Sequence, residues 1–283
     1  MQQLLSWVGS KWKDRFKIED FMQNSGPFSR FVEPFCGSAS MFFHLNPRRG
    51  WINDVNEELI EFYRTLRNGG SKPIMFHLIK HHVEEQMGRI SYSQFQKLKK
   101  EWEPKDEYER AAKFFLLNRC SYYGKLESFG GINYEDFSEE KLTHMYSTKL
   151  ACARLNEGGW ILEGSEITCV DFEEVLCNIR EDDFIFLDPP YDSKEMFGNN
   201  KACYGVEFVK EHLKLAKCLE KCKAKWLMTI NESDHIRSLY KDWAFIYEVV
   251  WQHKRNRSKD EMKKEFYITN YDAGWFAEVY KTG

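Results

Sequence analysis

The segment DDFIFLDPPYDSK, residues 182–194, joins an apolar run to two prolines and a tyrosine. The run predicts a buried strand that ends on the carboxylate of Asp188. Pro189 and Pro190 fix the backbone and remove two amide donors, which leaves the carbonyl of Pro189 as a preset acceptor. Tyr191 adds an aromatic face on which a planar base can stack. The segment therefore predicts a rigid group of acceptors at the end of a buried strand.

This group suits an exocyclic amine on a planar base, because the amine donates two hydrogens and two acceptors converge here. The alternative is a PPxY-type ligand for a WW domain, which needs exposed and extended surroundings. The apolar residues 184–187 directly before Asp188 favour burial and argue against that alternative.

Strand and helix signals alternate on both sides of this segment. Further strands are expected at 167–170, 225–230, 245–252 and 265–271, and a helix at 206–222. A short strand and an amphipathic helix are expected within 51–67, where the residues at helical spacing are Leu59, Ile60, Phe62, Tyr63 and Leu66. Such alternation predicts an α/β fold with a doubly wound, mostly parallel sheet. The last two strands have no helix between them and should pair antiparallel.

Residues 71–155 break this pattern. They are mostly helical in character and highly charged, with an irregular stretch, SYYGKLESFGGINYEDF, at 121–137. We therefore expect a catalytic core made of residues 1–70 and 156–283, and an inserted α-rich domain at 71–155.

The composition restricts the function less than the motifs do. With 283 residues, of which 42% are hydrophobic and 16% aromatic, the chain can bury a sizeable core. It has no apolar run of about 18 residues and no signal-peptide pattern at its start, so neither a membrane span nor export is expected. The net charge of −3 does not decide for or against nucleic acid, because a local basic face suffices for phosphate contacts.

The eight cysteines are scattered without a CxxC pair, which indicates reduced thiols in a cytoplasm. Cys218 and Cys222 lie one helical turn apart, but no Cys/His pair at zinc spacing follows them. We therefore expect no metal.

In open α/β sheets, ligands bind outside the carboxyl ends of the strands, and two further segments end there. Gly37 in FVEPFCGSAS, residues 31–40, permits a tight turn, although a generic turn between a strand and a helix would look similar. Asp54 follows the next strand, where an acidic side chain can accept hydrogen bonds from both ribose hydroxyls of a nucleoside cofactor. The alternative is a helix N-cap made by Asp54 or Asn56.

The order of these motifs resembles that of the Dam-like DNA adenine-N6 methyltransferases, over most of the chain. Besides D-P-P-Y at 188–191, the family motifs W-x-G-G-K, [DE]-P-F-x-G-x-G, N-D-x-N, G-D-F and E-x-x-I-T-N-Y correspond to residues 7–11, 33–39, 53–56, 170–172 and 265–271. Each motif is weak alone, but their joint occurrence is highly specific. The resemblance implies a seven-stranded Rossmann-like methyltransferase core whose inserted domain recognises the target sequence.

The resemblance also implies S-adenosylmethionine as the methyl donor. Trp7 and Lys11 would contact this cofactor, with Lys11 near its carboxylate, and Asp54 would hold its ribose. The full set of implied cofactor-binding residues is Trp7, Lys11, Glu33, Phe35, Gly37, Asp54, Asp171, Phe172 and Asp188.

Glu33, Phe35 and Gly37 would form the floor of the methionine pocket, and Asp171 with Phe172 would hold the cofactor adenine. Besides Val170 in place of the glycine of G-D-F, two residues near the pocket depart from the family pattern. Ser10 replaces the second glycine of the N-terminal motif, and Ala39 replaces the last glycine of the turn. Ala39 adds only a methyl group, so we expect the pocket to survive unless that position needs a positive φ.

Adenine N6 is a poor nucleophile, because its lone pair is delocalised into the ring. Hydrogen bonds from N6 to the Asp188 carboxylate and the Pro189 carbonyl would favour a more tetrahedral nitrogen, which attacks the sulfonium methyl in line. Since this amine lies inside a duplex, the target base must be flipped out and stack on Tyr191. The predicted catalytic residues are therefore Asp188, Pro189, Pro190 and Tyr191.

The inserted domain contains NRCSYYGKLESFGG, residues 118–131, which is similar to a shortened form of the family hairpin N-R-x-x-[FY]-N-G-L-x-R. Asn118, Arg119, Tyr123 and Lys125 are its candidate DNA contacts. The second half of the hairpin departs strongly, so GATC specificity does not carry over. Arg119 is also consistent with a charge at a helix C-terminus.

A second basic segment, HKRNRSKDEMKK at 253–264, lies between the last two strands. Arg255, Arg257 and Lys259 are its candidate phosphate contacts. Such a hairpin loop is equally consistent with a solvated surface.

The expected function is methylation of adenine N6 in a specific double-stranded DNA sequence. The alternatives are an adenine methyltransferase that acts on RNA, and a catalytically silent nucleic-acid-binding protein, against which the intact run 188–191 argues. We expect a protein of the cytoplasm of a bacterial or phage-infected cell, with no obligate protein partner. The sequence leaves open whether a restriction endonuclease accompanies it.

Overall fold

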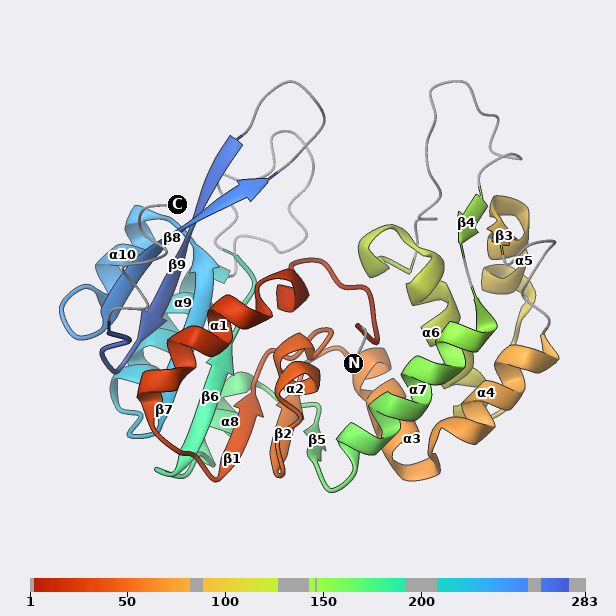
Figure 1. The fold of residues 1–283 in the computed structure, drawn as a ribbon, viewed down its shortest axis with the longest axis horizontal. Helices are drawn as coiled ribbons and strands as arrows, with labels where there is room; N and C mark the ends of the chain where they lie inside the picture. The colour runs from red at the N-terminus through yellow and green to blue at the C-terminus, as the bar shows by residue number, and fades with distance from the viewer. Residues whose placement is uncertain are drawn as a thin grey trace. The chain divides into compact units, whose positions relative to one another are not determined.

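The computed structural model describes residues 3–81, 89–126, 143–145, 147–191, 208–253 and 261–274 (Figure 1). By its internal contacts the chain divides into two compact units. Unit 1 comprises Met1–Lys13, Gly37–Pro47 and Asp54–Cys169; unit 2 comprises Asp14–Cys36, Arg48–Asn53 and Val170–Gly283. The division into a core and an inserted domain at 71–155 stays a prediction.

Seven strands form one sheet in the order β5-β2-β1-β6-β7-β9-β8. Their bounds are β1 (Arg30–Glu33), β2 (Gly50–Asn53), β5 (Glu166–Thr168), β6 (Asp183–Leu187), β7 (Lys225–Asn231), β8 (Phe245–His253) and β9 (Glu261–Thr269). β1 pairs in parallel with β2 and β6, and β6 with β7, whereas β9 is antiparallel to both β7 and β8. The predicted antiparallel pairing of the last two strands is confirmed. Because β2 and β6 lie on opposite sides of β1, the strand order switches at the carboxyl ends of β1 and β6.

Helices cover both faces of the sheet in unit 2, which confirms the doubly wound arrangement (Figure 1). α1 (Arg15–Met22), followed by η2 (Gln23–Ser25), packs on one face, where the ring of Phe21 lies 4.9 Å from that of Tyr267. On the other face, Phe266 belongs to an apolar cluster with the helices α8 (Phe172–Cys177), α9 (Phe208–Glu220) and α10 (Asp234–Tyr240). Phe266 and Tyr267 are consecutive residues of one strand, so their side chains point to opposite faces.

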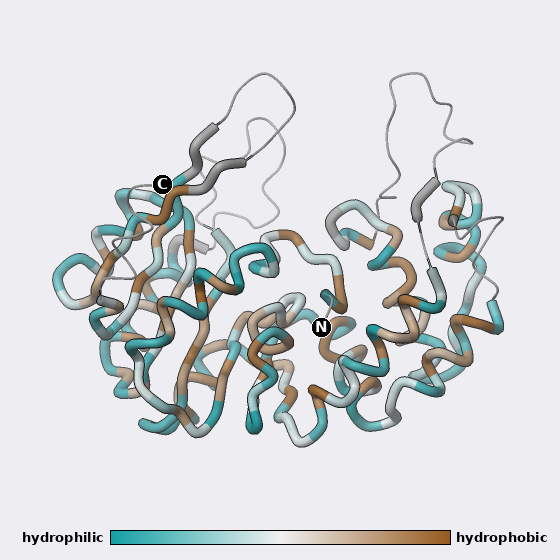
Figure 2. The backbone as a smooth tube through the Cα atoms, in the orientation of Figure 1, coloured by the Kyte–Doolittle hydropathy of each residue, from teal (hydrophilic) through white to brown (hydrophobic). Residues whose placement is uncertain are grey.

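This two-sided cover explains why β6 and β7 read as nearly continuous apolar runs. Every residue of β6 is buried, and in β7 only Lys225 is exposed. Figure 2 shows apolar residues following one another along the strands of unit 2, whereas polar and apolar residues alternate along the helices. Strands covered on both faces are expected to have this pattern.

Unit 1 is mostly helical in its described part. Besides β5, its elements are η1 (Lys11–Lys13), α2 (Ser40–Leu45), α3 (Glu57–Gly69), α4 (Ser71–Lys80), α5 (Tyr92–Glu101), α6 (Glu107–Cys120), η3 (Tyr122–Gly124), α7 (Thr148–Leu162), and an antiparallel pair of β3 (Arg89–Ser91) and β4 (Thr143–Met145). The apolar residues that predict α3 are all buried. None of the helices in the described ranges has both the length and the apolar composition needed to cross a membrane.

A buried ion pair joins the first residues of β1 and β6. Arg30 Nε donates to Asp183 Oδ1 at 3.1 Å, and Arg30 Nη2 donates to Asp183 Oδ2 at 2.7 Å. The Asp183 side chain has no exposed surface, and the guanidinium also lies 4.9 Å from the ring centre of Trp51. The two-bond geometry satisfies a carboxylate that water does not reach.

Arg30→Met is therefore expected to destabilise the fold by about 3–5 kcal/mol, because it leaves the carboxylate of Asp183 buried without its cation. Urea unfolding followed by circular dichroism measures this loss. Lys223→Met is the control. Lys223 and Glu181 form an ion pair of 2.8 Å on the surface, with side chains 77% and 71% exposed, so no measurable change is expected. Similar small losses in both variants would contradict the structural importance of the buried pair.

Candidate active site

A row of buried polar side chains lies on one face of the sheet in unit 2, at the carboxyl end of β7. Thr229 pairs directly with Tyr267, and Asn231 pairs with Glu265, across β7 and β9. Directly paired residues of antiparallel strands point to the same face, so Thr229, Asn231 and Glu265 all lie on the face that carries Tyr267. All three polar side chains are buried.

Asp188 belongs to this row. The register pairs Leu187 of β6 with Met228 of β7, so the next residues, Asp188 and Thr229, are neighbours with the same orientation. Thr229 Oγ1 donates a hydrogen bond of 3.0 Å to Asp188 Oδ1. Thr229 is fully buried, whereas Asp188 is partly exposed. The buried hydroxyl thus fixes the orientation of a carboxylate that faces the edge of the sheet.

The side chain of Tyr191 is held by the same row. Its hydroxyl donates to Oε1 of Glu265, and its half-buried ring packs against the apolar cluster of unit 2. The ring is therefore fixed at both ends, by packing at its base and by a carboxylate at its tip. A fixed ring loses little conformational entropy when a second planar group stacks on it.

Asn53, the last residue of β2, joins the segments that follow β1 and β5. Its Nδ2 donates to the carbonyls of Pro34 and Val170, each at 3.0 Å, and its Oδ1 accepts from the amide of Val170 at 3.1 Å. This fully buried side chain therefore ties together parts of three motifs, at 33–39, 53–56 and 170–172.

The predicted cofactor residues of these motifs in unit 2 lie close to this junction. The rings of Phe35 and Phe172 are 5.4 Å apart, and Glu33 is buried at the end of β1. Asp171 is the N-cap of α8, where its Oδ1 accepts from the amide of Glu173 at 2.9 Å. Asp171 therefore begins a helix; its contact with a cofactor stays a prediction.

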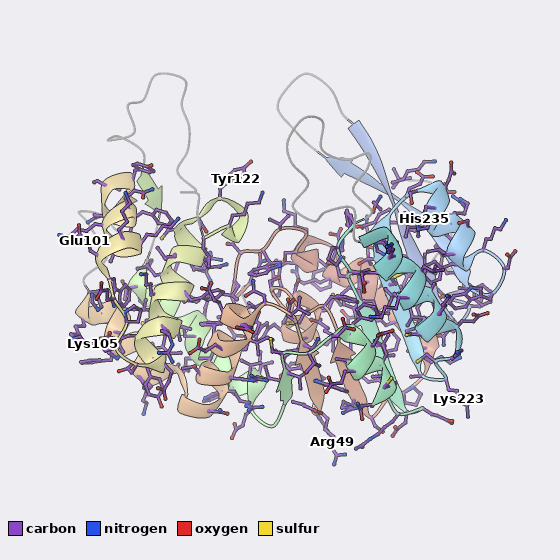
Figure 3. All side chains as sticks on the ribbon, turned by 180° about the vertical axis from the view of Figure 1, so that it is seen from behind. Arg49, Glu101, Lys105, Tyr122, Lys223 and His235 are labelled. Atoms are coloured by element: carbon purple, nitrogen blue, oxygen red, sulfur yellow. The ribbon has the colours of Figure 1, made fainter. Side chains whose placement is uncertain are left out.

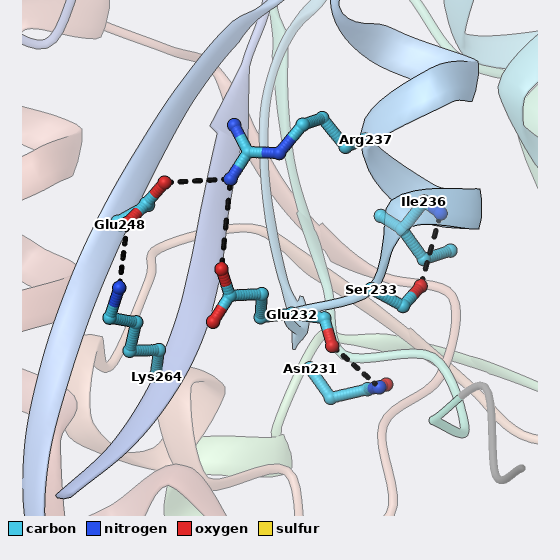
Figure 4. Close-up of polar contacts among 7 residues, drawn as sticks. All are labelled: Asn231, Glu232, Ser233, Ile236, Arg237, Glu248 and Lys264. Atoms are coloured by element: carbon cyan, nitrogen blue, oxygen red, sulfur yellow. Dashed lines mark hydrogen bonds and ion pairs between the residues drawn. The ribbon is translucent and has the colours of Figure 1, made fainter. Parts of the chain in front are cut away.

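The turn after β7 is fixed by polar contacts that Figure 4 shows. Ser233 caps α10 by accepting from the amide of Ile236 at 3.1 Å. Arg237 on the first turns of α10 donates to Glu248 of β8 at 2.6 Å, and Glu248 also accepts from Lys264 of β9 at 3.3 Å. These contacts hold the helix and the two strands beside the end of the polar row.

In unit 1, Gly37 begins a tight turn with a φ of +45°. A Cβ atom on Gly37 would lie 2.8 Å from Cδ1 and Nε1 of Trp7, so the backbone of the turn and the indole are in close contact. Gly37 N donates to Asp54 Oδ2 at 2.9 Å, and Gly37 O accepts from the hydroxyl of Tyr63 at 2.9 Å. The structure thus brings together three predicted cofactor residues, Trp7, Gly37 and Asp54.

Both carboxylate oxygens of Asp54 accept hydrogen bonds: Oδ2 holds the Gly37 turn, and Oδ1 accepts from the amide of Asn56 at 3.0 Å. Burial raises the pKa of the Asp54 carboxyl, and the backbone hydrogen bonds, first that from Gly37, oppose the rise. Asn56, not Asp54, is the N-cap of α3, and it accepts from the amide of Leu59 at 3.0 Å. Each carboxylate oxygen has two acceptor sites, so Asp54 can still accept from hydroxyl groups.

The two departures from the family motifs have different consequences. Ser10 does not have a positive φ, so its backbone does not require glycine. Its hydroxyl forms hydrogen bonds with those of Ser38 and Ser40, at 3.1 Å and 3.2 Å. Ala39 has a φ of +48°, which is the positive φ that makes an alanine unfavourable at this position.

The predicted cofactor residue Lys11 lies in η1 and is 4% exposed.

The predicted DNA contacts divide into described and undescribed residues. Asn118 is fully buried at the end of α6, and Arg119 Nη1 donates to Ser6 Oγ at 3.1 Å. Lys125 is exposed after η3, and η3 includes the backbone of Tyr123. Their DNA contacts stay predictions. Three further candidates lie outside the described residues: Arg255, Arg257 and Lys259.

Three of the described cysteines, Cys120, Cys218 and Cys222, are poorly suited to nucleophilic attack or to binding a metal as thiolates. Burial raises the pKa of Cys120 to about 12, and burial also raises the pKa values of Cys218 and Cys222. A raised pKa keeps a thiol protonated at neutral pH, whereas nucleophilic attack and zinc binding both need the thiolate.

Sequence reasoning did not identify Thr229 and Glu265 as site residues. Both are polar residues inside buried strands, and that is the signal that could have found them. The contacts of Thr229 with Asp188 and of Glu265 with Tyr191 become apparent only from the register of β6, β7 and β9.

Comparison with known proteins gives a family match. Residues 7–255 match the model of the D12 class N6 adenine-specific DNA methyltransferases. The type II methyltransferase M.CviBI of Paramecium bursaria Chlorella virus NC1A is 28% identical over 287 residues, which cover 96% of this chain and 100% of that protein. The DNA N-6-adenine-methyltransferase of Escherichia phage P1 is 28% identical over 268 residues, 92% of this chain but 34% of that protein. The DNA adenine methylase of Vibrio cholerae serotype O1 is 24% identical over 245 residues, 84% of each chain.

The close approach of Trp7 to Gly37 predicts that Gly37→Ala destabilises the protein more than Gly9→Ala. Both glycines have a positive φ, so each alanine costs about 1–2 kcal/mol in backbone strain. A Cβ at Gly9 would meet nothing within 4 Å, whereas at Gly37 it would displace the indole, which adds about 1–3 kcal/mol. Urea unfolding of both variants measures the difference, and equal losses would show that Trp7 moves aside without cost.

Proposed function

The chain belongs to the D12 class of N6 adenine-specific DNA methyltransferases, and from this premise we propose that S-adenosylmethionine is its methyl donor and that Asp188 orients the amine that is methylated. DNA is the substrate of this family, and N6 of adenine is the atom that receives the methyl group. The observation that carries the proposal is the hydrogen bond from Thr229 to Asp188, because it holds a carboxylate in one orientation beside Tyr191. The family match also favours DNA over RNA as the substrate.

Each unit, taken by itself, contains residues that fit the chemistry of this donor. In unit 1, the carboxylate of Asp54 can accept from ribose hydroxyls, next to the Gly37 turn and the Trp7 indole. In unit 2, the neighbouring rings of Phe35 and Phe172 provide an apolar surface of the kind that a purine requires. Unit 1 also contains Lys11, whose charge suits a carboxylate, and unit 2 contains Glu33, whose charge suits an amine.

When bound, the sulfonium donor would supply a methyl group that the positive charge on sulfur activates. The N–C bond would form as the S–C bond breaks, the electron pair of that bond would stay on sulfur, and the methylated N6 would release one proton to water. The Asp188 carboxylate accepts one hydrogen bond from the N6 amine, and the carbonyl of Pro189 accepts a second. These two acceptors shift the lone pair of N6 out of the ring, and Pro190 keeps the loop rigid. Because the donor is already activated, most of what the protein contributes is positioning.

Tyr191 provides the surface on which the target adenine stacks after leaving the duplex. The contact between its hydroxyl and Glu265 keeps the ring in place before the base arrives. Stacking of one base on an aromatic side chain contributes about 1–3 kcal/mol, which is comparable to the cost of unstacking it from DNA.

We assign DNA contacts to Arg119, Lys125 and the basic segment 253–264. A side chain that reads a base edge discriminates between sequences, whereas a phosphate contact weakens with salt on all sequences alike. The target sequence and the existence of a restriction endonuclease counterpart stay predictions to be tested.

Binding of the donor should stabilise the fold. At 100 times its dissociation constant, S-adenosylmethionine is expected to raise the free energy of unfolding by about 2.7 kcal/mol. Asp54→Ala should reduce this gain, because it removes the acceptor for the ribose. Asp106→Ala is a matched control, since Asp106 also accepts from a backbone amide at a helix start, that of Glu109 at 2.8 Å, but it caps α6 and does not bond the Gly37 turn. Thermal unfolding with and without the donor gives both values, and a cofactor-free wild type that showed no gain would refute the choice of donor.

Methylation of host DNA tests the catalytic assignment. Sequencing DNA from cells that express the wild type should detect N6-methyladenine in one sequence context, and Asp188→Ala should abolish it while the protein stays folded. Thr229→Val should lower kcat about 5- to 10-fold, because one hydrogen bond of about 1 kcal/mol no longer orients Asp188. Thr229→Ser keeps the hydroxyl and should stay near the wild-type rate. If Asp188→Ala retained more than about a tenth of that rate, a loss under about 1.4 kcal/mol, the acceptor role would be wrong.

A further inference from the structure

The end of α6 holds the backbone of the N-terminal segment through Asn118. Ser6 N donates to Asn118 Oδ1 at 2.9 Å, and Asn118 Nδ2 donates to Ser6 O at 2.8 Å. One side-chain amide thus satisfies both backbone groups of a residue 112 positions away in the sequence. Asn118 is fully buried, so water cannot replace these hydrogen bonds without opening the structure.

Two neighbours of Asn118 also contact Ser6. Gly124, with a φ of +74°, approaches so closely that a Cβ atom on it would lie 2.0 Å from Ser6 O. Arg119 Nη1 donates to Ser6 Oγ at 3.1 Å. Figure 3 shows Tyr122 projecting outward from the same turn, and its side chain is 52% exposed. The turn after α6 therefore has an inner side that holds Ser6 and an outer side that is accessible.

Ser6 directly precedes Trp7, whose indole lies against the Gly37 turn that Asp54 holds. All of these residues belong to unit 1. A continuous series of contacts therefore leads from the exposed turn after α6, through Ser6 and Trp7, to Gly37 and Asp54. A shift of the Ser6 carbonyl also shifts the backbone amide of Trp7, because the two groups belong to one planar trans peptide unit.

We propose that Asn118 is a positioning residue for the methyl-donor site, and that through Ser6 and Trp7 it couples this site to DNA bound at the turn after α6. The proposal rests on the proposed function, in which Trp7, Gly37 and Asp54 hold the donor and residues 119–125 approach DNA. In this role Asn118 acts through Ser6, because its side chain is fully buried and is bonded to both backbone groups of that residue. By linkage, if DNA at the turn tightens donor binding, the donor tightens DNA binding by the same factor.

Calorimetric titration of the full chain with S-adenosylhomocysteine tests the positioning role without turnover. Asn118→Ala should weaken binding of this product about 5- to 30-fold, the effect of about two lost hydrogen bonds. Asn270→Ala is the matched control. Asn270 makes the same kind of backbone bridge in unit 2, donating to Ala224 O at 2.8 Å and accepting from Trp226 N at 3.1 Å. It should lower the melting temperature without changing the dissociation constant of the product.

The same titrations with fragments of unmethylated plasmid DNA test the coupling. DNA should tighten binding of the product to the wild type by a factor within the usual range of about 5–150, and this factor should fall toward one in Asn118→Ala. If Asn118→Ala fails to fold, Asn118→Asp replaces it, because it has nearly the same shape, keeps the acceptor for Ser6 N and loses the amide donor to Ser6 O and Gly124 O.

The outcomes separate the inference from the function on which it rests. A wild type that does not bind S-adenosylhomocysteine at all would refute the proposed donor, whatever the variants do. A wild type that binds it, with an Asn118 variant of equal affinity, would overturn the positioning role alone. The coupling would be overturned if DNA did not change the dissociation constant of the product in the wild type, or if DNA changed it by the same factor in the wild type and in the Asn118 variant. Equal weakening in Asn118→Ala and Asn270→Ala would show a general loss of stability and also overturn the positioning role.

Discussion

The register between β6 and β7 is the constraint on which the candidate active site depends. Pairing of Leu187 with Met228 places Asp188 beside Thr229, and the alternation of side chains puts both on the same face. A shift by one residue would bring Asp188 beside a residue that points to the opposite face, and the hydrogen bond could not form. The apolar residues that fix this register, such as Ile185 and Trp226, are completely buried, so the hydrophobic core determines the orientation of the carboxylate.

The loop that follows β6 needs this support because loops are otherwise mobile. Its two prolines restrict the backbone, but they cannot fix the side chain of Tyr191. The tyrosine side chain is fixed instead by Glu265, which lies on β9, the strand antiparallel to β7, and accepts a hydrogen bond from the Tyr191 hydroxyl. The antiparallel end of the sheet therefore supports a site that is otherwise built on parallel strands.

The sequence predicted those features that depend on local pattern. The helix α3 followed from apolar residues such as Leu59 and Leu66, and the antiparallel pairing of β8 and β9 followed from the absence of a helix between them. It did not predict partners that only pairing brings together, such as Thr229 for Asp188. Nor did it predict that Asn118 binds Ser6, because nothing local indicates a contact across 112 residues. The alternatives for Asp54 could not be separated because neighbouring residues share the tasks: Asn56 caps the helix, and Asp54 holds the Gly37 turn.

The buried polar row, which consists of Asp188, Thr229, Asn231 and Glu265, is less favourable for stability than apolar residues would be. Burial of a hydroxyl or a carboxylate is unfavourable unless it is hydrogen-bonded, and apolar residues of similar size would stabilise the edge of the sheet more simply. On the same face of β6 and β7, Phe186 and Leu227 lie further from this edge and are apolar and buried. The other buried carboxylate of these two strands, Asp183 at the start of β6, is paired with Arg30. Thr229, Asn231 and Glu265 gather at the carboxyl end of β7, where an open α/β sheet binds its ligands. A fold selected for stability alone would have no reason to place them there, so the polar row is itself an argument that this edge carries the chemistry.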